Sequence, residues 1–186
     1  MCRETISAYS NLKIMAEESL YTKKVIEHFR KPHNMGRIKN PDGVGKVGNL
    51  QCGDVMWLYI KVGKNKKGRE IIKDIKFETY GCVAALATSS VITDMAKGKT
   101  LEEALEIKKD NVVKELGGLP PVKIHCSLLA TDALCEAIYD YLTKQKRPIP
   151  EKLLKIHQRI EKEKNLVEKN YKNWVETEEK MHNETE

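Results

Sequence analysis

The spacing of hydrophobic positions changes several times along the chain, and each spacing predicts a different element. Between residues 19 and 30, apolar side chains recur at helical intervals, which predicts a helix with Ser19 as its N-cap. Two runs, 55–62 and 70–80, flank a turn rich in lysine and glycine and predict a β-hairpin, although apolar and polar residues alternate imperfectly in the second. A further run at 44–51 adds one strand. We therefore expect a three-stranded antiparallel meander with one face available for helices.

Helical spacing dominates the next part of the chain. A long apolar helix is expected to end at Gly98, and Thr100 and Glu103 form a capping box that starts a short helix. Asp110 is the expected N-cap of the helix after it. Four helices are thus predicted, at about 83–97, 100–108, 110–116 and 127–146. The fold class that follows is α+β, a three-stranded antiparallel sheet packed with helices.

Pro148 and Pro150 mark the clearest boundary in the chain. Beyond them, in a segment dominated by lysine and glutamate, hydrophobic residues recur every seven positions at Leu153, Ile160, Val167 and Trp174. This pattern predicts a charged amphipathic helix that docks on the body or on a partner rather than a sustained coiled coil. Three parts are expected: a flexible N-terminal extension over 1–18, one domain over 19–147, and a proline linker with a helical tail over 148–186.

Composition narrows the range of functions. The chain has 186 residues and a net charge of +6, but its basic residues are dispersed without an arginine-rich block, which disfavours nucleic-acid binding. No apolar run approaches the roughly 20 residues that span a membrane, and no secretory signal is evident, so we expect a cytoplasmic protein. The chain has five cysteines, an odd number, and no evident secretory signal. Both features favour metal binding or thiol chemistry over disulfide bonds.

The stretch Leu119 to Ser127, with the sequence Leu-Pro-Pro-Val-Lys-Ile-His-Cys-Ser, concentrates the candidate chemistry. Its two prolines should hold the chain extended and deliver Cys126 to the start of the helix that follows. The helix dipole there, together with the positive charge of Lys123, favours the thiolate form of a cysteine. Cys126 is therefore a candidate metal ligand or sulfur nucleophile.

Two more cysteines stand at the ends of predicted elements, Cys52 at a turn between strands and Cys82 at a turn before a helix. Asp54 lies two residues after Cys52, so both side chains point to the same side of an extended chain. Three thiolates, with the Asp54 carboxylate and the His125 imidazole as optional ligands, suit zinc or an iron-sulfur cluster. The sequence contains no C-x-x-C pair, which disfavours a zinc ribbon, a thioredoxin-like enzyme or a ferredoxin.

The remaining cysteines and histidines are assigned no chemical role. Cys135 follows Cys126 by nine residues, half a turn out of phase on a helix, so we expect it in the core. Cys2 lies in the N-terminal extension and is discounted as a ligand. Surface positions are expected for the helical histidines His28, His157 and His182.

Three stretches, Cys52-Gly-Asp-Val-Met56, Tyr80-Gly-Cys82 and Leu119 to Ser127, resemble the ligand motifs of the IscU/NifU-type iron-sulfur cluster assembly scaffolds. They occur in the order of the family, and the resemblance runs from about Tyr21 to Lys146. The third motif is the most specific. The chain departs from the family's common pattern at Val83 and Ala84, where Gly and Ser are usual, and in its helical tail.

The resemblance implies a non-enzymatic scaffold. In such a family a cysteine desulfurase passes persulfide sulfur to the scaffold, Fe²⁺ is bound, and a transient [2Fe-2S] cluster forms and is transferred to acceptor apoproteins. Cys52, Cys82 and Cys126 would be the cluster thiolates, and Cys126 would also accept the persulfide. Asp54 would bind iron or zinc and keep the cluster labile, with His125 as the alternative ligand.

The resemblance also has implications for partners. The segment formed by Leu119, Pro120, Pro121, Val122 and Lys123 resembles one that a specialised Hsp70-type chaperone recognises. A segment that merely positions His125 and Cys126 explains the same residues equally well. Zn²⁺ is expected as an occupant of the cluster-free form, and a homodimer stays open as an assembly state.

Two other functions use the same residues. A zinc-binding protein, or a zinc-dependent sulfur acceptor of the SufU type, would use the same ligands. The SufU type would carry an insertion between the second and third cysteines and lack the adjacent histidine, whereas here the interval is 126 − 82 = 44 residues and His125 is present. A thiol enzyme with Cys126 as nucleophile and His125 as base is disfavoured, because adjacent side chains point apart and no third group orients the base.

Overall fold

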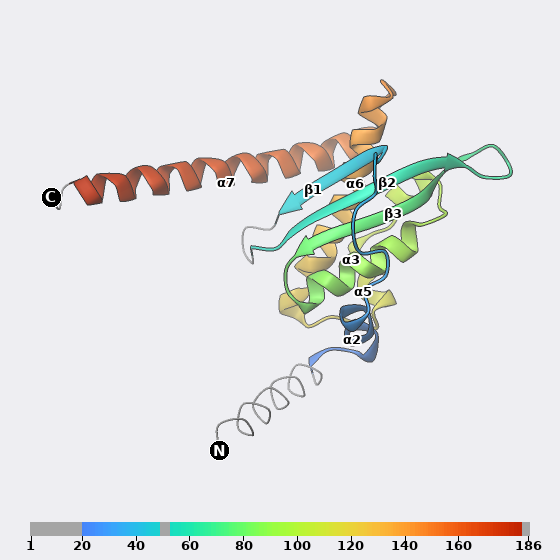
Figure 1. Cartoon of the computed structure of the whole chain (residues 1–186), viewed down its shortest axis with the longest axis horizontal. Helices are drawn as coiled ribbons and strands as arrows, with labels where there is room; N and C mark the ends of the chain where they lie inside the picture. The colour runs from blue at the N-terminus through green and yellow to red at the C-terminus, as the bar shows by residue number, and fades with distance from the viewer. Residues whose placement is uncertain (1–19, 49–52, 184–186) are drawn as a thin grey trace, which may run out of the picture.

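The computed structural model describes residues 20–48 and 53–183, with the side chains of the last helix described through Leu166 and at Lys169 (Figure 1). In chain order the described elements are α2 (Lys23–Arg30), β1 (Gly43–Gly48), β2 (Val55–Lys64), β3 (Glu70–Tyr80), α3 (Val83–Ala96), α4 (Leu101–Leu105), α5 (Lys109–Glu115), the 3₁₀ turn η1 (Pro121–Lys123), α6 (His125–Lys144) and α7 (Glu151–Asn183).

The three strands form one antiparallel sheet in the order β1-β2-β3, which confirms the predicted meander. The register of β2 on β3 shifts between Lys61 and Val62, which leaves Lys73 as an extra residue in a β-bulge. Because of this bulge, Ile72 and Ile75 can both be fully buried although they are three positions apart. The imperfect alternation in the sequence of this strand has its cause here.

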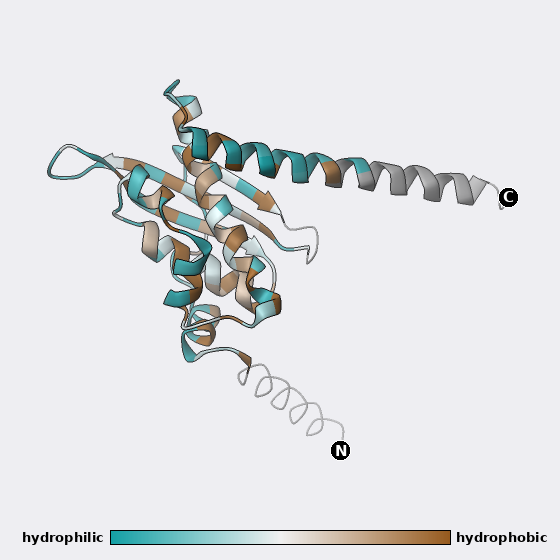
Figure 2. Ribbon diagram, turned by 180° about the vertical axis from the view of Figure 1, so that it is seen from behind, coloured by the Kyte–Doolittle hydropathy of each residue, from teal (hydrophilic) through white to brown (hydrophobic). Residues whose placement is uncertain are grey.

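Helices α3 and α6 cover one face of the sheet. They lie behind the strands in Figure 1 and in front of them in Figure 2, which is seen from the opposite side. Strand β1 approaches α6 so closely that a Cβ atom at Gly45 would lie 2.0 Å from the carbonyl oxygen of Ala133. Glycine permits this backbone contact, because it has no side chain to displace. The layer between sheet and helices is the main hydrophobic core.

Helix α2 begins later than the sequence suggested. Its N-cap is Thr22, whose Oγ1 accepts a hydrogen bond from the Val25 N–H at 3.2 Å. The same hydroxyl donates to the carbonyl oxygen of Leu116, which ties the start of α2 to the end of α5. The prediction of Ser19 as the N-cap of this helix is therefore wrong, and Ser19 itself lies outside the described residues.

The capping box before α4 is confirmed. The Glu103 N–H donates to Thr100 Oγ1 at 3.2 Å, and the Thr100 N–H donates to Glu103 Oε2 at 3.0 Å. The cap predicted at Asp110 is wrong, because α5 starts at Lys109 with Lys108 as its N-cap. Asp110 instead lies in the first turn of α5, where its carboxylate interacts favourably with the helix dipole.

Helix α7 docks on α6 at its start and then extends away from the body (Figure 1). Leu153 and Ile160, the first two residues of the predicted stripe, are 1% and 7% exposed and belong to the main core. Arg159 donates to Asp132 of α6 at 2.6 Å. Among the described residues, no helix is both long and apolar enough to cross a membrane. The predicted docking of the tail is confirmed over this part.

His157 is not the simple surface residue that the sequence suggested. Its ring stacks on Tyr139, with the ring centroids 3.8 Å apart, and its Nδ1 lies 3.0 Å from Glu136 Oε1. Burial raises the pKa of the Glu136 carboxyl, while its hydrogen bond to His157 acts in the opposite direction. The side chains of Val167, Trp174 and His182 lie outside the described part of α7.

Candidate metal centre

The register of the hairpin brings two of the motifs together. Val55 at the start of β2 pairs with Tyr80 at the end of β3, so the residues just outside the pair, Asp54 and Gly81, lie next to each other. Cys82 follows Gly81 and is the N-cap of α3. Two residues far apart in the sequence, Asp54 and Cys82, therefore reach one end of the sheet.

Gly81 is required by the space that Asp54 occupies. A Cβ atom at position 81 would lie 2.9 Å from the Asp54 Cγ and 2.8 Å from the Cβ of Ala85. Both distances are below ordinary van der Waals contact, so any side chain there would displace the carboxylate or the first turn of α3. Glycine at this position leaves the carboxylate room beside Cys82.

The third motif differs from the extended strap that the sequence suggested. Pro120 is extended, with φ −54° and ψ 140°, but the chain then turns through η1 and enters α6 at His125. The helix thus begins two residues before the predicted Ser127, because the 3₁₀ turn leads directly into it. Cys126 still lies in the first turn of a long helix, as expected.

Asp54, Cys82 and Cys126 converge, and together with His125 they form what we call the thiolate site. The two Sγ atoms are 3.8 Å apart, and Asp54 Oδ2 lies 3.8 Å from Cys82 Sγ and 3.7 Å from Cys126 Sγ. Ligands of a tetrahedral ion with metal-sulfur bonds of about 2.3 Å have sulfur atoms about 3.8 Å apart, and a sulfur about 3.5 Å from an oxygen ligand. The triangle therefore has nearly the dimensions that one tetrahedral metal ion requires.

His125 adds a nitrogen donor to this triangle. Ligand atoms of His125, Cys126 and Asp54 all lie within 4.8 Å of one another. Among the described residues, His125 Nε2 is the one buried side-chain nitrogen or oxygen without a hydrogen-bond partner. An unpaired buried nitrogen is costly unless something binds it. The His125 imidazole thus fits a metal ligand better than a structural hydrogen-bonding group.

The electrostatics of the site favour an anionic thiolate at Cys82. Its hydrogen bond with Cys126 is the main cause that lowers the pKa of Cys82 to about 6, and the backbone N–H of Ala85 and the charge of Lys123 act in the same direction. Burial and the negative charge of Asp54 oppose this shift. In turn, the charge of Cys82 is the main cause that raises the pKa of Lys123. A thiolate that is already formed needs to lose no proton when a metal binds.

Two members of the thiolate site are shielded from water and a third is partly exposed. Cys126 is fully buried and Asp54 is 4% exposed, whereas Cys82 is only partly buried. Leu119 packs against the small cluster around Cys126, while Val122 in η1 is 75% exposed. The segment from Leu119 through Pro120 and Pro121 to Lys123 therefore connects the molecular surface to the buried thiol.

Of the three predicted cysteine ligands, Cys82 and Cys126 lie in the described part of the chain and Cys52 does not. Cys135 is buried in the main core, and burial raises the pKa of its thiol to about 12, so the prediction of a core cysteine is confirmed. A second convergence, of His28 with His33 and Asp94, was not predicted from the sequence, since Asp94 is 61 residues from His33 and no local motif links them.

Comparisons with known proteins identify the family of this chain. The NifU-like N terminal domain model matches residues 20–148. The iron-sulfur cluster assembly scaffold protein IscU 1 of Archaeoglobus fulgidus is 53% identical over 143 residues, which cover 77% of this chain and 90% of that protein. The protein of the same kind from Haemophilus influenzae is 52% identical and covers 67% of this chain and 98% of its own length. Both are named as scaffolds rather than enzymes, as the resemblance implied.

A solved structure confirms the fold. The N-terminal NifU-like protein from Brucella abortus, 26% identical, superposes with a TM-score of 0.52 and covers 67% of this chain and 96% of its own. The α+β architecture predicted from the sequence is thus shared with that protein. From the match over residues 20–148 and relatives at about half identity, this chain belongs to the NifU-like N-terminal domain family of IscU/NifU-type assembly scaffolds.

Proposed function

We propose that this protein is a scaffold on which an iron-sulfur cluster is assembled and from which it is transferred to other proteins. The observation that carries the proposal is the triangle of Asp54, Cys82 and Cys126, with sides of 3.7 to 3.8 Å. The orphaned nitrogen of His125 beside it supports the same function. The names of the relatives from Archaeoglobus and Haemophilus agree with this assignment.

In this proposal the cluster is cargo. Cys52, Cys82 and Cys126 supply thiolates to iron, as in other protein-bound clusters. Asp54 takes the place of a fourth cysteine, and His125 is its alternative. An oxygen or nitrogen donor binds iron less firmly than a thiolate does, so the mixed set suits a [2Fe-2S] cluster that must leave. Zn²⁺ would occupy the same ligands when no cluster is present.

Sulfur enters as a persulfide on Cys126. The Cys126 thiolate attacks the terminal sulfur of a desulfurase persulfide, a new S–S bond forms, and the desulfurase cysteine leaves as a thiolate. A two-electron reductant, such as a dithiol, then releases sulfide to the bound Fe²⁺. Because Cys126 is fully buried, this transfer requires η1 and the first turn of α6 to open. Lys123 would stabilise the attacking thiolate.

The partners of such a scaffold are proposals of the same kind. A cysteine desulfurase donates sulfur and acceptor apoproteins receive the cluster. The exposed segment from Leu119 to Lys123, with Val122 75% exposed, suits a contact for an Hsp70-type chaperone that opens the site. A cytoplasmic location, an N-terminal extension over 1–18 and a proline linker with a charged helical tail over 148–186 belong to the same proposal. A homodimer is an alternative state of assembly.

A permanent zinc site is the second candidate function, because the triangle fits a single tetrahedral Zn²⁺ equally well. The two functions differ in whether inorganic sulfide is retained. A zinc site holds one ion and no sulfide, whereas a scaffold exchanges that ion for iron and sulfide.

Anaerobic reconstitution separates the two. The full chain is incubated with Fe²⁺, cysteine, a dithiol and a cysteine desulfurase, and iron, zinc and acid-labile sulfide are measured after desalting. We expect sulfide and iron to appear together with a visible chromophore, and both to fall at least tenfold in Cys82→Ser and Cys126→Ser. Cys135→Ser is the matched control in the same helix and should load like the parent chain. A chain that keeps its zinc and binds no labile sulfide contradicts the scaffold function.

A further inference from the structure

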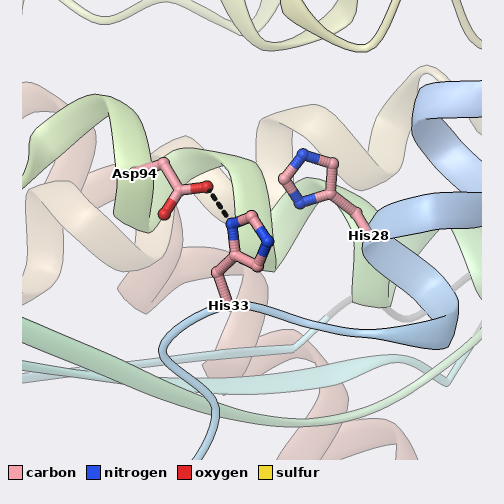
Figure 3. Close-up of side chains that lie close together, drawn as sticks. All are labelled: His28, His33 and Asp94. Carbon is pink, nitrogen blue, oxygen red and sulfur yellow. Dashed lines mark hydrogen bonds and ion pairs between the residues drawn. The ribbon is translucent and has the colours of Figure 1, made fainter.

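A second group of metal-ligand side chains gathers at the other end of α3. His28 comes from α2, His33 from the loop that follows it, and Asp94 from the last turns of α3 (Figure 3). One potential ligand atom of each residue lies within 4.8 Å of those of the other two. The His33 ring lies between Asp94 and His28 in Figure 3. We call these three residues the imidazole site.

Ser90 fixes the orientation of the His28 ring. Its hydroxyl oxygen lies 2.8 Å from His28 Nδ1 and accepts the backbone N–H of His33, also at 2.8 Å. Ser90 is fully buried, so water does not compete for these two contacts. When His28 Nδ1–H donates to Ser90, its Nε2 carries a lone pair available to a ligand. Protein metal sites commonly orient their histidines in this way.

Asp94 is held from two sides. His33 Nδ1 lies 2.6 Å from Asp94 Oδ2, and Asn34 Nδ2 donates to Asp94 Oδ1 at 3.0 Å. Asn34 Nδ2 also lies 3.0 Å from Thr93 Oγ1, which places the amide between two neighbouring residues of α3. The carboxylate is therefore oriented by a residue that is not itself one of the three ligands.

The loop that carries His33 is fixed to the sheet as well as to α3. The Phe77 N–H donates to the Asn34 carbonyl at 3.1 Å, and the Gly36 N–H donates to the Phe77 carbonyl at 2.7 Å. Asn34 adopts a left-handed backbone conformation, with φ +56°. Residues other than glycine adopt it rarely, and asparagine is among the most tolerant. The loop is thus locked in a shape that presents His33 to Asp94.

We propose that His28, His33 and Asp94 form a second metal site, which binds a divalent first-row transition ion such as Zn²⁺ or Fe²⁺. Two imidazoles and one carboxylate are donors that these ions accept, whereas Mg²⁺ and Ca²⁺ prefer sets made of oxygen alone. The remaining coordination positions would be taken by water, since His33 and Asp94 are 48% and 39% exposed. This site goes beyond the proposed scaffold function and requires none of the cysteines.

The three ligand atoms need only a small movement to reach coordination distance. Nitrogen and oxygen ligands of a tetrahedral ion are about 3.4 Å apart when the bonds are about 2.1 Å long. A separation of up to 4.8 Å therefore has to close by up to about 1.4 Å. The contact of 2.6 Å between His33 Nδ1 and Asp94 Oδ2 would open as these two exposed side chains rotate onto the ion.

The local charges are compatible with a cation. Burial lowers the pKa of His28 and the neighbouring His33 acts in the same direction, whereas the charge of Asp94 acts in the opposite direction. Lys97 Nζ, which lies 3.5 Å from Asn34 Oδ1, is paired with Asp74 at 2.8 Å. Asp94 thus supplies a negative charge to the site itself.

The imidazole site is separate from the thiolate site. Asp94 follows Cys82 by twelve residues along α3, which at 1.5 Å per residue is about 18 Å. No single ion or [2Fe-2S] cluster spans that distance. The two sites can therefore be tested independently, and failure of one leaves the other unaffected.

The test uses the full chain with the thiolate site disabled by Cys52→Ser, Cys82→Ser and Cys126→Ser. Equilibrium dialysis against Zn²⁺ at pH 7.5 should give one bound ion per chain, and Mg²⁺ in excess should not displace it. Adding His33→Gln should weaken zinc binding at least tenfold. His157→Gln is the matched control, because His157 is also an imidazole beside a carboxylate but belongs to no group of three potential ligands among the described residues. It should leave zinc binding unchanged.

Co²⁺ supplies a second readout in the same background. We expect the weak visible bands of nitrogen and oxygen coordination without the intense thiolate-to-cobalt absorption, and these bands should be lost in Asp94→Asn. Asp94→Asn preserves the shape of the side chain, so it keeps the test valid if His33→Gln unfolds. The proposal is overturned if the cysteine-substituted chain binds no Zn²⁺ at micromolar concentration, or if His33→Gln and Asp94→Asn bind it like His157→Gln.

Discussion

Helix α3 has a group of potential metal ligands at each end, and the two groups differ in donor type and in exposure. At its N-terminus, Cys82 lies with Asp54 and the fully buried Cys126. At its C-terminal end, Asp94 lies with two imidazoles that are partly or well exposed. Soft, buried thiolates suit a cluster that must be protected from water and oxidation, whereas exposed imidazoles suit an exchangeable ion.

The two sites also differ in how their ligand atoms are hydrogen-bonded when no metal is bound. The thiolate site has an orphaned nitrogen, at His125 Nε2, and a thiol whose pKa is lowered to about 6. In the imidazole site, His28 Nδ1 instead pairs with Ser90, His33 Nδ1 pairs with Asp94, and Asn34 donates to the Asp94 carboxylate. One end of the helix is thus set for occupancy, and the other is oriented for binding but stable when empty.

The largest expected effect concerns thiol reactivity in the metal-free chain. With a pKa of about 6, about nine tenths of Cys82 is thiolate at pH 7. With a pKa of about 12, only about one part in 10⁵ of Cys135 is thiolate at the same pH. Alkylation with iodoacetamide, followed by peptide mass spectrometry, should modify Cys82 at least a thousand times faster than Cys135. Below pH 6 the Cys82 rate should fall about tenfold per pH unit, and above pH 6 it should level off.

Cys126 sharpens this comparison because it lies beside Cys82 but is fully buried. Its alkylation should be slower than that of Cys82 and should speed up when η1 is loosened by Pro121→Ala. If Cys126 reacts as fast as Cys82 in the unaltered chain, the site is more open than the structure indicates.

The next effect comes from the space around Asp54. Gly81→Ala places a Cβ atom 2.9 Å from the Asp54 Cγ, so the carboxylate must move away from the two sulfur atoms. We expect zinc affinity at the thiolate site to fall at least tenfold and the free energy of unfolding to fall by about 1 to 3 kcal/mol. Competition with a chromophoric chelator and urea unfolding measure the two quantities.

Gly48→Ala provides the control for that substitution. The nearest atom to a Cβ at Gly48 is 3.8 Å away, which is ordinary contact. Equal losses of zinc affinity in Gly81→Ala and Gly48→Ala would show that the crowding around Asp54 does not determine how tightly the thiolate site binds zinc.

At the imidazole end, Ser90→Ala removes the anchor of His28 while leaving all three proposed ligands. Partners that orient a ligand typically contribute 10- to 100-fold to metal affinity. We expect zinc binding in the cysteine-substituted chain to weaken about tenfold. The same substitution in the chain with intact cysteines should leave cluster loading at the thiolate site unchanged, which distinguishes an effect on the imidazole site from one on the whole of α3. An unchanged zinc affinity would mean that Ser90 serves only the packing of α2 against α3.

The smallest expected effects are two opposite shifts in the titration of Cys82. The charge of Asp54 raises the pKa of Cys82 and that of Lys123 lowers it. Asp54→Asn should therefore move the midpoint of Cys82 alkylation below that of the parent chain, and Lys123→Gln should move it above. Shifts in the same direction for both variants would contradict the charge arrangement of the site.

The sequence was sufficient for the order of elements and for several local features. Alternation predicted the meander, the capping box at Thr100 and Glu103 was found as expected, and the half-turn offset placed Cys135 in the core. These features depend on residues a few positions apart, where helix and strand geometry alone decide which side chains meet.

Features that depend on tertiary contacts were not predictable in the same way. The bulge at Lys73 shifts a register between two strands, and the convergence of His33 with Asp94 joins residues 61 positions apart. The start of α6 at His125 follows from a 3₁₀ turn that two prolines gave no reason to expect. For the thiolate site, motifs named the residues, but only the pairing of Val55 with Tyr80 explains why Asp54 lies beside Cys82.

The most direct test of the central claim is the transfer of a cluster from this chain. The reconstituted, desalted protein is mixed anaerobically with an apo-ferredoxin, the two are separated, and acid-labile sulfide is measured on each. We predict that sulfide and iron move together to the ferredoxin, and that Asp54→Cys, which replaces the weak carboxylate ligand by a thiolate, slows the transfer. Sulfide that stays on the chain, or a chain that holds zinc and never binds sulfide, would contradict the central claim.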